Sequence, residues 1–168
     1  MAKVITFSRI FPAYHPRKGE PTFFAEKFLS SLNIAPADFS EQLSNIVDVF
    51  GYFNGEYDPK NHTIRAGNRF KAGDYFSPRV WSGKPYNSKQ IIIAHDIEIE
   101  NIMDIEIVGS TSNGKHLGLG AIYINGKMFF DWHELAKNDG LSLDDMESWF
   151  TDLPFKGQII CWNKNINY

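Results

Sequence analysis

The sequence has only one cysteine, Cys161, among its 168 residues. A lone cysteine excludes an internal disulfide framework. Cys161 lies in the apolar run 159–162, where we expect a buried structural thiol, because apolar surroundings raise a thiol pKa and make the nucleophilic thiolate scarce. The composition therefore argues against a catalytic cysteine.

Sequence patterns for metal and cofactor sites are also missing. The five histidines include no i, i+4 pair on a predicted helix, and no cysteine cluster accompanies them, so zinc-binding spacing is absent. The sequence has no glycine-rich phosphate loop ending in Gly-Lys-Ser/Thr and no nucleophile elbow around a serine. We therefore expect neither a metal ion nor a cofactor.

No apolar run approaches the length needed to cross a bilayer, and the first residues lack a signal-like apolar segment. These absences favour a cytoplasmic location and no membrane partner. The hydrophobic content of 43%, with 15% aromatic residues, is ample for a packed core. A length of 168 residues suits one domain, residues 1–168.

The charge of the chain is unevenly distributed. The formal net charge is −3, which argues against binding of nucleic acid by the whole surface. Residues 60–89 hold seven basic side chains and one acidic side chain, so this segment carries +6 and the remainder −9. A local cationic surface suits a phosphate or a short single strand. Alternatively, these are ordinary lysines and arginines on the solvent face of strands.

The pattern of apolar residues predicts an α+β fold that is mainly β. Asn125-Gly126 predicts a hairpin turn, because both residues tolerate a positive φ. The segment 109–118, rich in glycine and serine, is predicted to be a flexible connection. Strands are expected at residues 4–9, 62–65, 74–81, 90–94, 97–108, 121–124, 128–130 and 158–162.

Helices are predicted near both ends of the chain. Thr22 is expected to cap a helix whose apolar residues follow helical spacing, and a second helix is expected at about 36–49. Together they form a helical insertion at about 20–50. Two short helices are expected to begin after the caps Asp131 and Ser142, with Gly140 between them.

The segment 59–81 is the strongest candidate for function. Thr63 and Arg65 share one face of a predicted strand, because side chains alternate along a strand, and Lys60 precedes it. A desolvated lysine amine can take the proton of a threonine hydroxyl and so make it a nucleophile. Alternatively, Lys60 is a solvated turn residue, Thr63 an ordinary strand residue and Arg65 a surface ion-pair partner.

The spacing Lys60, Thr63, Arg65, followed by Phe70-Lys71-Ala72-Gly73-Asp74, resembles the signature of the ASCH domain, a relative of PUA domains. Further stretches follow in the order seen in small bacterial ASCH proteins that act as N4-acetylcytidine amidohydrolases. They are residues 5–7, 105–107, 135–143 and 158–162. The resemblance covers about residues 3–9 and 59–163, and the segment 10–58 between them is not part of it.

The resemblance implies a small PUA-like β-barrel with flanking helices. We expect residues 4–9 to form its first strand and residues 158–162 its last. It also implies Lys60 as base, Thr63 as nucleophile and Asp139 as acidic partner. Asp139 stands where the family usually has a longer glutamate, and a helix cap is the alternative role. Arg65 is expected to hold the substrate. Three further cations, Arg69, Lys71 and Arg79, are expected to bind it too.

Two functions follow from this sequence. The first is an amidohydrolase acting on an acylated nucleoside or base. The second is a non-catalytic module that binds RNA or a modified nucleotide through the same cations. In either case the expected partner is a nucleoside or a short single-stranded RNA.

Overall fold

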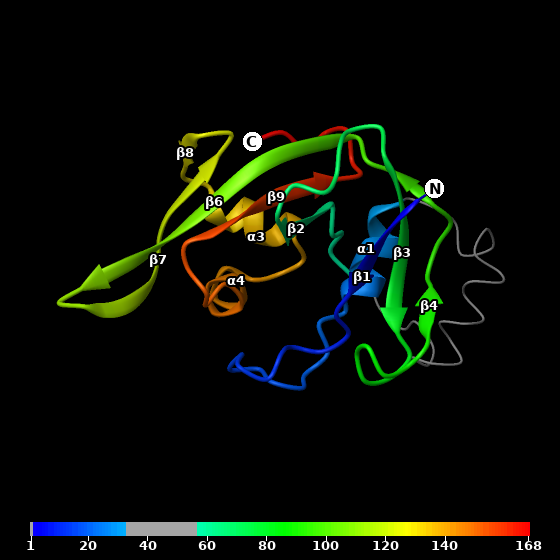
Figure 1. Cartoon of the computed structure of the whole chain (residues 1–168), viewed down its shortest axis with the longest axis horizontal. Helices are drawn as coiled ribbons and strands as arrows, with labels where there is room; N and C mark the ends of the chain where they lie inside the picture. The colour runs from blue at the N-terminus through cyan, green and yellow to red at the C-terminus, as the bar shows by residue number, and fades with distance from the viewer. Residues whose placement is uncertain (1, 33–56) are drawn as a thin grey trace. The chain divides into compact units, whose positions relative to one another are not determined.

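The structure, a computed structural model, describes residues 2–32 and 57–168 (Figure 1). It is a mixed α+β fold made mainly of sheet, which confirms the predicted fold class. The chain divides into two compact units. The first comprises residues 1–60 and 74–98, and the second comprises residues 61–73 and 99–168. No helix within the described residues is long and apolar enough to span a membrane.

The first unit contains a sheet of four strands: β1 (Lys3–Phe7), β3 (Tyr75–Trp81), β4 (Gln90–Ile92) and β5 (Ile97–Glu98). β1 pairs with β3 in parallel, whereas β4 and β5 both pair with β3 in antiparallel fashion. β5 pairs with residues 75–76 and β4 with residues 79–81, so Pro78 falls at the break between them. A proline supplies no N–H to a ladder, and this accounts for the position of the break.

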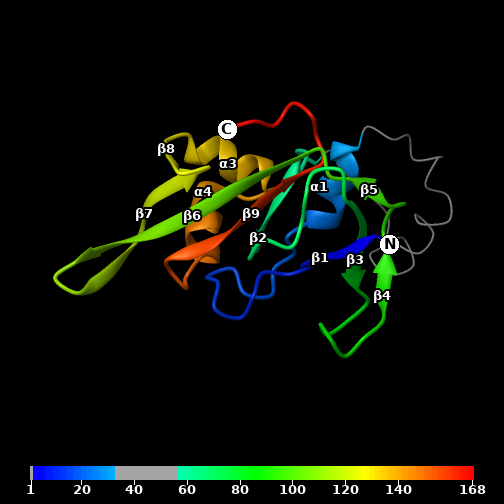
Figure 2. The same ribbon diagram turned by 45° about the horizontal axis from the view of Figure 1, so that its top comes forward.

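The helix α1 (Phe24–Ser31) lies beside β1 and β3 of this sheet (Figure 2). It packs against the sheet through aromatic side chains. The Phe28 ring lies 5.0 Å from that of Phe7 on β1 and 6.2 Å from that of Phe76 on β3. The helix begins after Phe23, which has a φ of 57°, and the Thr22 hydroxyl accepts a hydrogen bond from the Phe24 N–H at 3.3 Å. The N-cap is therefore Phe23, and the expected cap Thr22 lies one residue before it, so the predicted cap residue is wrong by one position. The expected helix at 36–49 lies outside the described residues.

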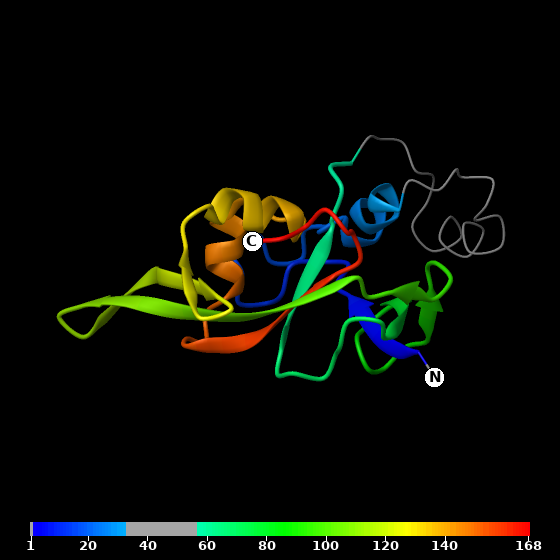
Figure 3. The same ribbon diagram turned by 90° about the horizontal axis from the view of Figure 1, so that it is seen from above.

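The second unit contains a sheet of five antiparallel strands in the order β2-β9-β6-β7-β8 (Figure 3). The strands are β2 (His62–Ala66), β6 (Asn101–Ser112), β7 (Lys115–Ile124), β8 (Lys127–Phe129) and β9 (Phe155–Cys161). β2 and β8 form its two edges. Along β6 the buried residues Met103, Ile105 and Ile107 alternate with more exposed residues, so one face of the sheet forms the core.

The predicted flexible connection at 109–118 is wrong. β6 and β7 continue through it as a hairpin, with irregularities of register at Val108/Gly109 and Ser110/Thr111. Backbone hydrogen bonds hold this pair together where apolar side chains are few. The hairpin turns at Asn113-Gly114, both of which have positive φ values, so the Asn-Gly signal was present in the sequence.

Turns and caps follow the prediction closely. Asn125 and Gly126 have φ values of 50° and 77° and join β7 to β8. The Asp131 carboxylate accepts from the Glu134 N–H at the start of α3 (Trp132–Asn138). Ser142 accepts from the Asp145 N–H at the start of α4 (Leu143–Trp149). These turns and caps are predictable because each depends only on residues a few positions apart in the chain.

The strands pair into two open sheets, and these pairings do not close into the expected barrel. The expected first and last strands illustrate this. β1 pairs with β3 in the first unit, and β9 lies between β2 and β6 in the second. The mainly β, α+β class is thus confirmed, and the barrel is not.

Candidate functional site

Lys60 is the last residue of its segment in the first unit, and its side chain is almost fully buried, with 1% exposed. Its N–H donates to the Lys27 carbonyl oxygen at 2.9 Å, and its Nζ lies 4.5 Å from the centroid of the Phe24 ring. Lysine is rarely buried to this extent, since desolvation disfavours its charged form. The solvated turn residue considered as the alternative is therefore excluded for Lys60.

Thr63 belongs to β2, an edge strand of the second unit, and it too is buried, with 3% exposed. It pairs with Ile160 of β9, and Arg65 two residues later pairs with Gln158. Because side chains alternate, Thr63 and Arg65 project from the same face of β2, as the spacing predicted. Arg65 is only partly buried. This face of the strand therefore carries a hydroxyl and a guanidinium together.

Asp139 is a buried residue at the C-terminal end of α3. Its backbone N–H donates to the Leu135 carbonyl oxygen at 3.1 Å. Asp139 is thus the C-cap of α3, the kind of position considered as the alternative to a catalytic role. A carboxylate is electrostatically disfavoured at this end of a helix, where the dipole is negative. Its carboxylate Oδ1 lies 3.6 Å from His62 Nδ1. An imidazole thus faces the carboxylate in place of solvent.

His62 is fully buried and links Asp139 to a polar cluster in the second unit. Its Nε2 lies 2.7 Å from the oxygen of the Tyr168 hydroxyl, and Asn138 Nδ2 donates to that same oxygen at 3.0 Å. Asn61 Nδ2 donates to Asn138 Oδ1 at 2.8 Å. Burial, the main cause, raises the Tyr168 pKa, so the phenol keeps its proton. When that proton is donated to Nε2, the imidazole N–H is on Nδ1, facing Asp139.

This cluster was not predicted from the sequence. His62 is one of five histidines without zinc-binding spacing, and its contact with Tyr168 spans 106 positions of the chain. The only feature of the sequence that could have drawn attention to His62 is its position directly before Thr63. The two side chains project from opposite faces of β2, so His62 and Asp139 lie on the face opposite to that of Thr63 at this point of the strand.

The cations expected to bind substrate are divided between the units. Arg65, Arg69 and Lys71 belong to the second unit, and Arg79 belongs to the first. Arg69 and Lys71 are exposed on the turn after β2. Arg79 donates to Ser77 Oγ at 3.2 Å and to Gln90 Oε1 at 3.1 Å, so its guanidinium takes part in the sheet of the first unit.

The turn that carries Arg69 and Lys71 is held firmly by one glutamine. Gln158 Oε1 accepts from the Phe70 N–H, and Gln158 Nε2 donates to the Phe70 carbonyl oxygen, both at 3.1 Å. The guanidinium carbon of Arg69 lies 5.2 Å from the centroid of the Phe70 ring. A fixed turn with an aromatic and two exposed cations can present charge to a phosphate.

The described residues contain no group of three histidine, cysteine or acidic side chains arranged to hold a metal ion. Cys161, as predicted, is buried. Burial, and to a lesser degree the charge of Asp139, raises the Cys161 pKa to about 12. At neutral pH this thiol is therefore protonated and a poor nucleophile.

Cys161 is expected to resist alkylation in the folded protein. At pH 8 a thiol-specific reagent such as iodoacetamide should modify less than a few per cent of it under conditions that modify the urea-unfolded chain completely. Mass spectrometry of the labelled protein measures both. Rapid labelling of the folded protein would contradict the buried, protonated thiol.

Comparison with protein-family models, curated protein sequences and solved structures finds no match for this chain. The resemblance to ASCH domains therefore depends on the residues quoted above.

Proposed function

We propose that this protein is an amidohydrolase that removes an acyl group from the amine of a nucleoside or base. The observation that carries the proposal is the burial of Lys60, with 1% of the residue exposed. A lysine that only attracts phosphate works best in contact with solvent, whereas a lysine that acts as a base must be desolvated to lose its proton. Lys60 stands three positions before the buried hydroxyl of Thr63.

In the proposed reaction the neutral Lys60 amine takes the proton from the Thr63 hydroxyl, and Oγ1 attacks the acyl carbon. The C–N bond of the amide then breaks, and Lys60 returns the proton to the leaving nitrogen. The acyl group is left as an ester on Thr63. Water, activated by the same amine, hydrolyses this ester and regenerates the hydroxyl. With N4-acetylcytidine the products are cytidine and acetate.

Arg65 and Asp139 complete the proposal. Arg65 projects from the same strand face as Thr63, and its guanidinium is suited to stabilise the oxyanion that develops on the substrate carbonyl. Asp139 is the acidic partner that the ASCH resemblance implies, but it lies beside His62 on the strand face opposite to that of Thr63, so the steps above give it no contact with the Thr63 hydroxyl. Its neighbour His62 is held by the Tyr168 hydroxyl, so the carboxylate faces a side chain with little freedom to move.

We also propose that the fold is a PUA-like barrel of the ASCH type. What supports it is the order of the sequence motifs from residue 5 to residue 162. The hairpin β7–β8, the two short capped helices and the final strand β9 follow one another in the predicted order.

The second candidate is a non-catalytic module that binds a nucleoside or a short single-stranded RNA. It is favoured by the exposure of Arg69 and Lys71 on a turn anchored by Gln158. Such a turn attracts phosphate without any need for a buried base. The two candidates differ in one product, the free carboxylic acid.

Thr63→Val should lower the rate of acetate release from N4-acetylcytidine by at least about 100-fold, since it removes only the nucleophilic hydroxyl. Valine is close to threonine in shape and suits a buried strand position, so the fold should persist. Thr63→Ser, which keeps a hydroxyl, should retain part of the activity. Thr111→Val, at an exposed position of β6, is the matched control. A fully active Thr63→Val variant would exclude Thr63 as nucleophile.

A further inference from the structure

The first unit contains a cavity of about 450 Å³ at the end of its sheet. This volume lies within the range of small-molecule sites in proteins. None of the cations expected to bind substrate is among the described residues that line it. The side chains that give it its chemistry are Phe7, Arg9, Trp81, Lys84 and Pro85.

The cavity lies where two parallel strands end. Phe7, the last residue of β1, pairs with Val80, and Trp81 is the last residue of β3. The cavity is lined by these strand ends and by the two segments that follow them, residues 8–10 and 83–85. In open α/β sheets ligands bind just beyond the carboxyl ends of the parallel strands, and the ends of β1 and β3 offer a position of the same kind in this mixed sheet.

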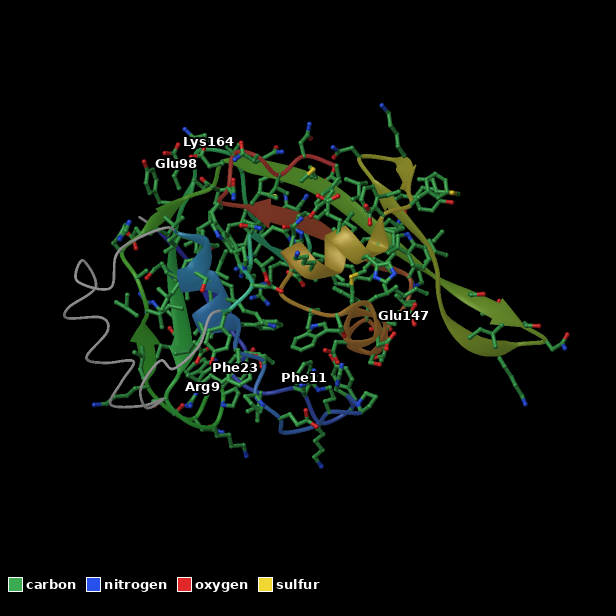
Figure 4. All side chains as sticks on the ribbon, turned by 180° about the vertical axis from the view of Figure 1, so that it is seen from behind. Arg9, Phe11, Phe23, Glu98, Glu147 and Lys164 are labelled. Atoms are coloured by element: carbon green, nitrogen blue, oxygen red, sulfur yellow. The ribbon has the colours of Figure 1, made fainter. Side chains whose placement is uncertain are left out.

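Two cations from different segments line this cavity. Arg9, which is labelled in Figure 4, follows β1. Its Nη1 donates to the Ser82 carbonyl oxygen at 3.4 Å, and its own carbonyl oxygen accepts from the Thr22 N–H. Lys84 is exposed on the loop after β3. Among the described residues that line the cavity, none is acidic. Burial, opposed in part by the charge of Glu26, lowers the Arg9 pKa, yet a guanidinium keeps its charge at neutral pH.

Two aromatic rings accompany the cations. Trp81 lines the cavity, and the Tyr86 ring centroid lies 5.4 Å from that of Trp81. Tyr86 is 88% exposed and has a φ of 64°, a left-handed conformation that costs energy for a residue with a side chain. The Asn87 N–H donates to the Lys84 carbonyl oxygen at 3.1 Å, so this conformation belongs to a turn that holds the exposed Tyr86 ring beside Trp81.

The loop between β3 and β4 is fixed by its own hydrogen bonds. The Ser82 N–H donates to the Lys89 carbonyl oxygen at 2.9 Å. The Ser88 hydroxyl accepts from the Gly83 N–H at 3.0 Å and donates to the Lys84 carbonyl oxygen at 2.9 Å. Lys84 and Tyr86 are thus presented on a preformed loop, which lowers the entropic cost of binding.

We propose that this cavity binds a planar ring that carries a phosphate, the chemistry of a nucleoside monophosphate. Trp81, which lines the cavity, offers a face for the ring, and Tyr86 beside it extends this aromatic surface. Arg9 and Lys84 offer charge to the phosphate. This site goes beyond the proposed acyl hydrolysis, which requires no phosphate on the substrate. The ligand is either a free nucleotide or the 5′-phosphorylated end of a single strand.

Titration of the purified protein with cytidine 5′-monophosphate and adenosine 5′-monophosphate, followed by tryptophan fluorescence and calorimetry, tests the proposal. Each nucleotide should bind at least about 10-fold more tightly than the matching nucleoside or inorganic phosphate, since both halves of the ligand contribute. A tetranucleotide with a 5′-phosphate identifies the source. Equal or tighter binding assigns a strand end, and weaker binding assigns the free nucleotide.

Lys84→Ala changes an exposed loop residue and should weaken nucleotide binding about 10-fold, while nucleoside binding stays the same. Trp81→Leu should weaken both. Should Trp81→Leu fail to fold, Tyr86→Ala provides the same test at an exposed position. Lys115→Ala, on the exposed end of the β6–β7 hairpin, is the matched control. No binding of either nucleotide at millimolar concentration, or unchanged binding by Lys84→Ala, overturns the proposal.

Discussion

Lys60→Met is expected to abolish the hydrolysis of N4-acetylcytidine while leaving nucleoside binding largely intact. Methionine fills a similar volume and suits a buried site beside the Phe24 ring, so the fold should tolerate it. Only the amine is lost, and with it the base that takes the proton from Thr63. Loss of a general base lowers kcat by roughly 100-fold to 10,000-fold. Steady-state acetate release and equilibrium nucleoside binding measure the two effects separately.

A second substitution at the same position separates a base from a simple positive charge. Lys60→Arg keeps the charge but cannot give up its proton at neutral pH, so it should be as inactive as Lys60→Met. Lys18→Met, at an exposed position of the N-terminal loop, is the control for loss of a lysine. Substantial activity in Lys60→Arg would show that Lys60 supplies charge and is not the base.

Gly157→Ala is expected to have the largest effect on stability. Gly157 lies in β9 and pairs with Ala66 of β2. A Cβ at this position would lie 2.1 Å from the Arg65 carbonyl oxygen and 2.9 Å from its carbonyl carbon. These are backbone atoms that cannot rotate away, so β2 would have to separate from β9. Because β2 also carries Thr63, activity should fall with stability.

The expected loss in the free energy of unfolding is about 3 kcal/mol or more, the upper part of the range for overpacked sites. Urea unfolding monitored by tryptophan fluorescence measures it. Gly83→Ala is the matched control, since its nearest neighbour is Ser88 Cβ at 3.5 Å, an ordinary contact. It should change stability by less than about 0.5 kcal/mol. Similar stability of the two variants would show that β2 does not approach β9 so closely.

Local features of the fold were predictable because their causes lie within a few residues. The caps of α3 and α4 and the turn at Asn125-Gly126 each depend on neighbours in the chain. The hairpin at Asn113-Gly114 had the same signal, but the surrounding glycines and serines favoured a loop. There the ladder between β6 and β7 determines the structure, and side-chain composition does not.

Features that depend on distant pairings were not predictable from these patterns. The parallel pairing of β1 with β3 joins segments about 70 positions apart, and alternation along a strand does not specify its partner. Burial of Lys60 was also not evident, because the sequence around it reads equally well as a solvated turn. The contact between His62 and Tyr168 arises in the same way, from packing of remote segments.

Acetate release from N4-acetylcytidine by the purified wild-type protein, measured alongside cytidine formation and nucleoside binding, is the most direct test of the proposed function. The account predicts acetate and cytidine in equal amounts, with turnover lost in Thr63→Val and Lys60→Met. A wild-type protein that binds nucleosides yet releases no acetate from N4-acetylcytidine or related amides would contradict it and favour the binding module.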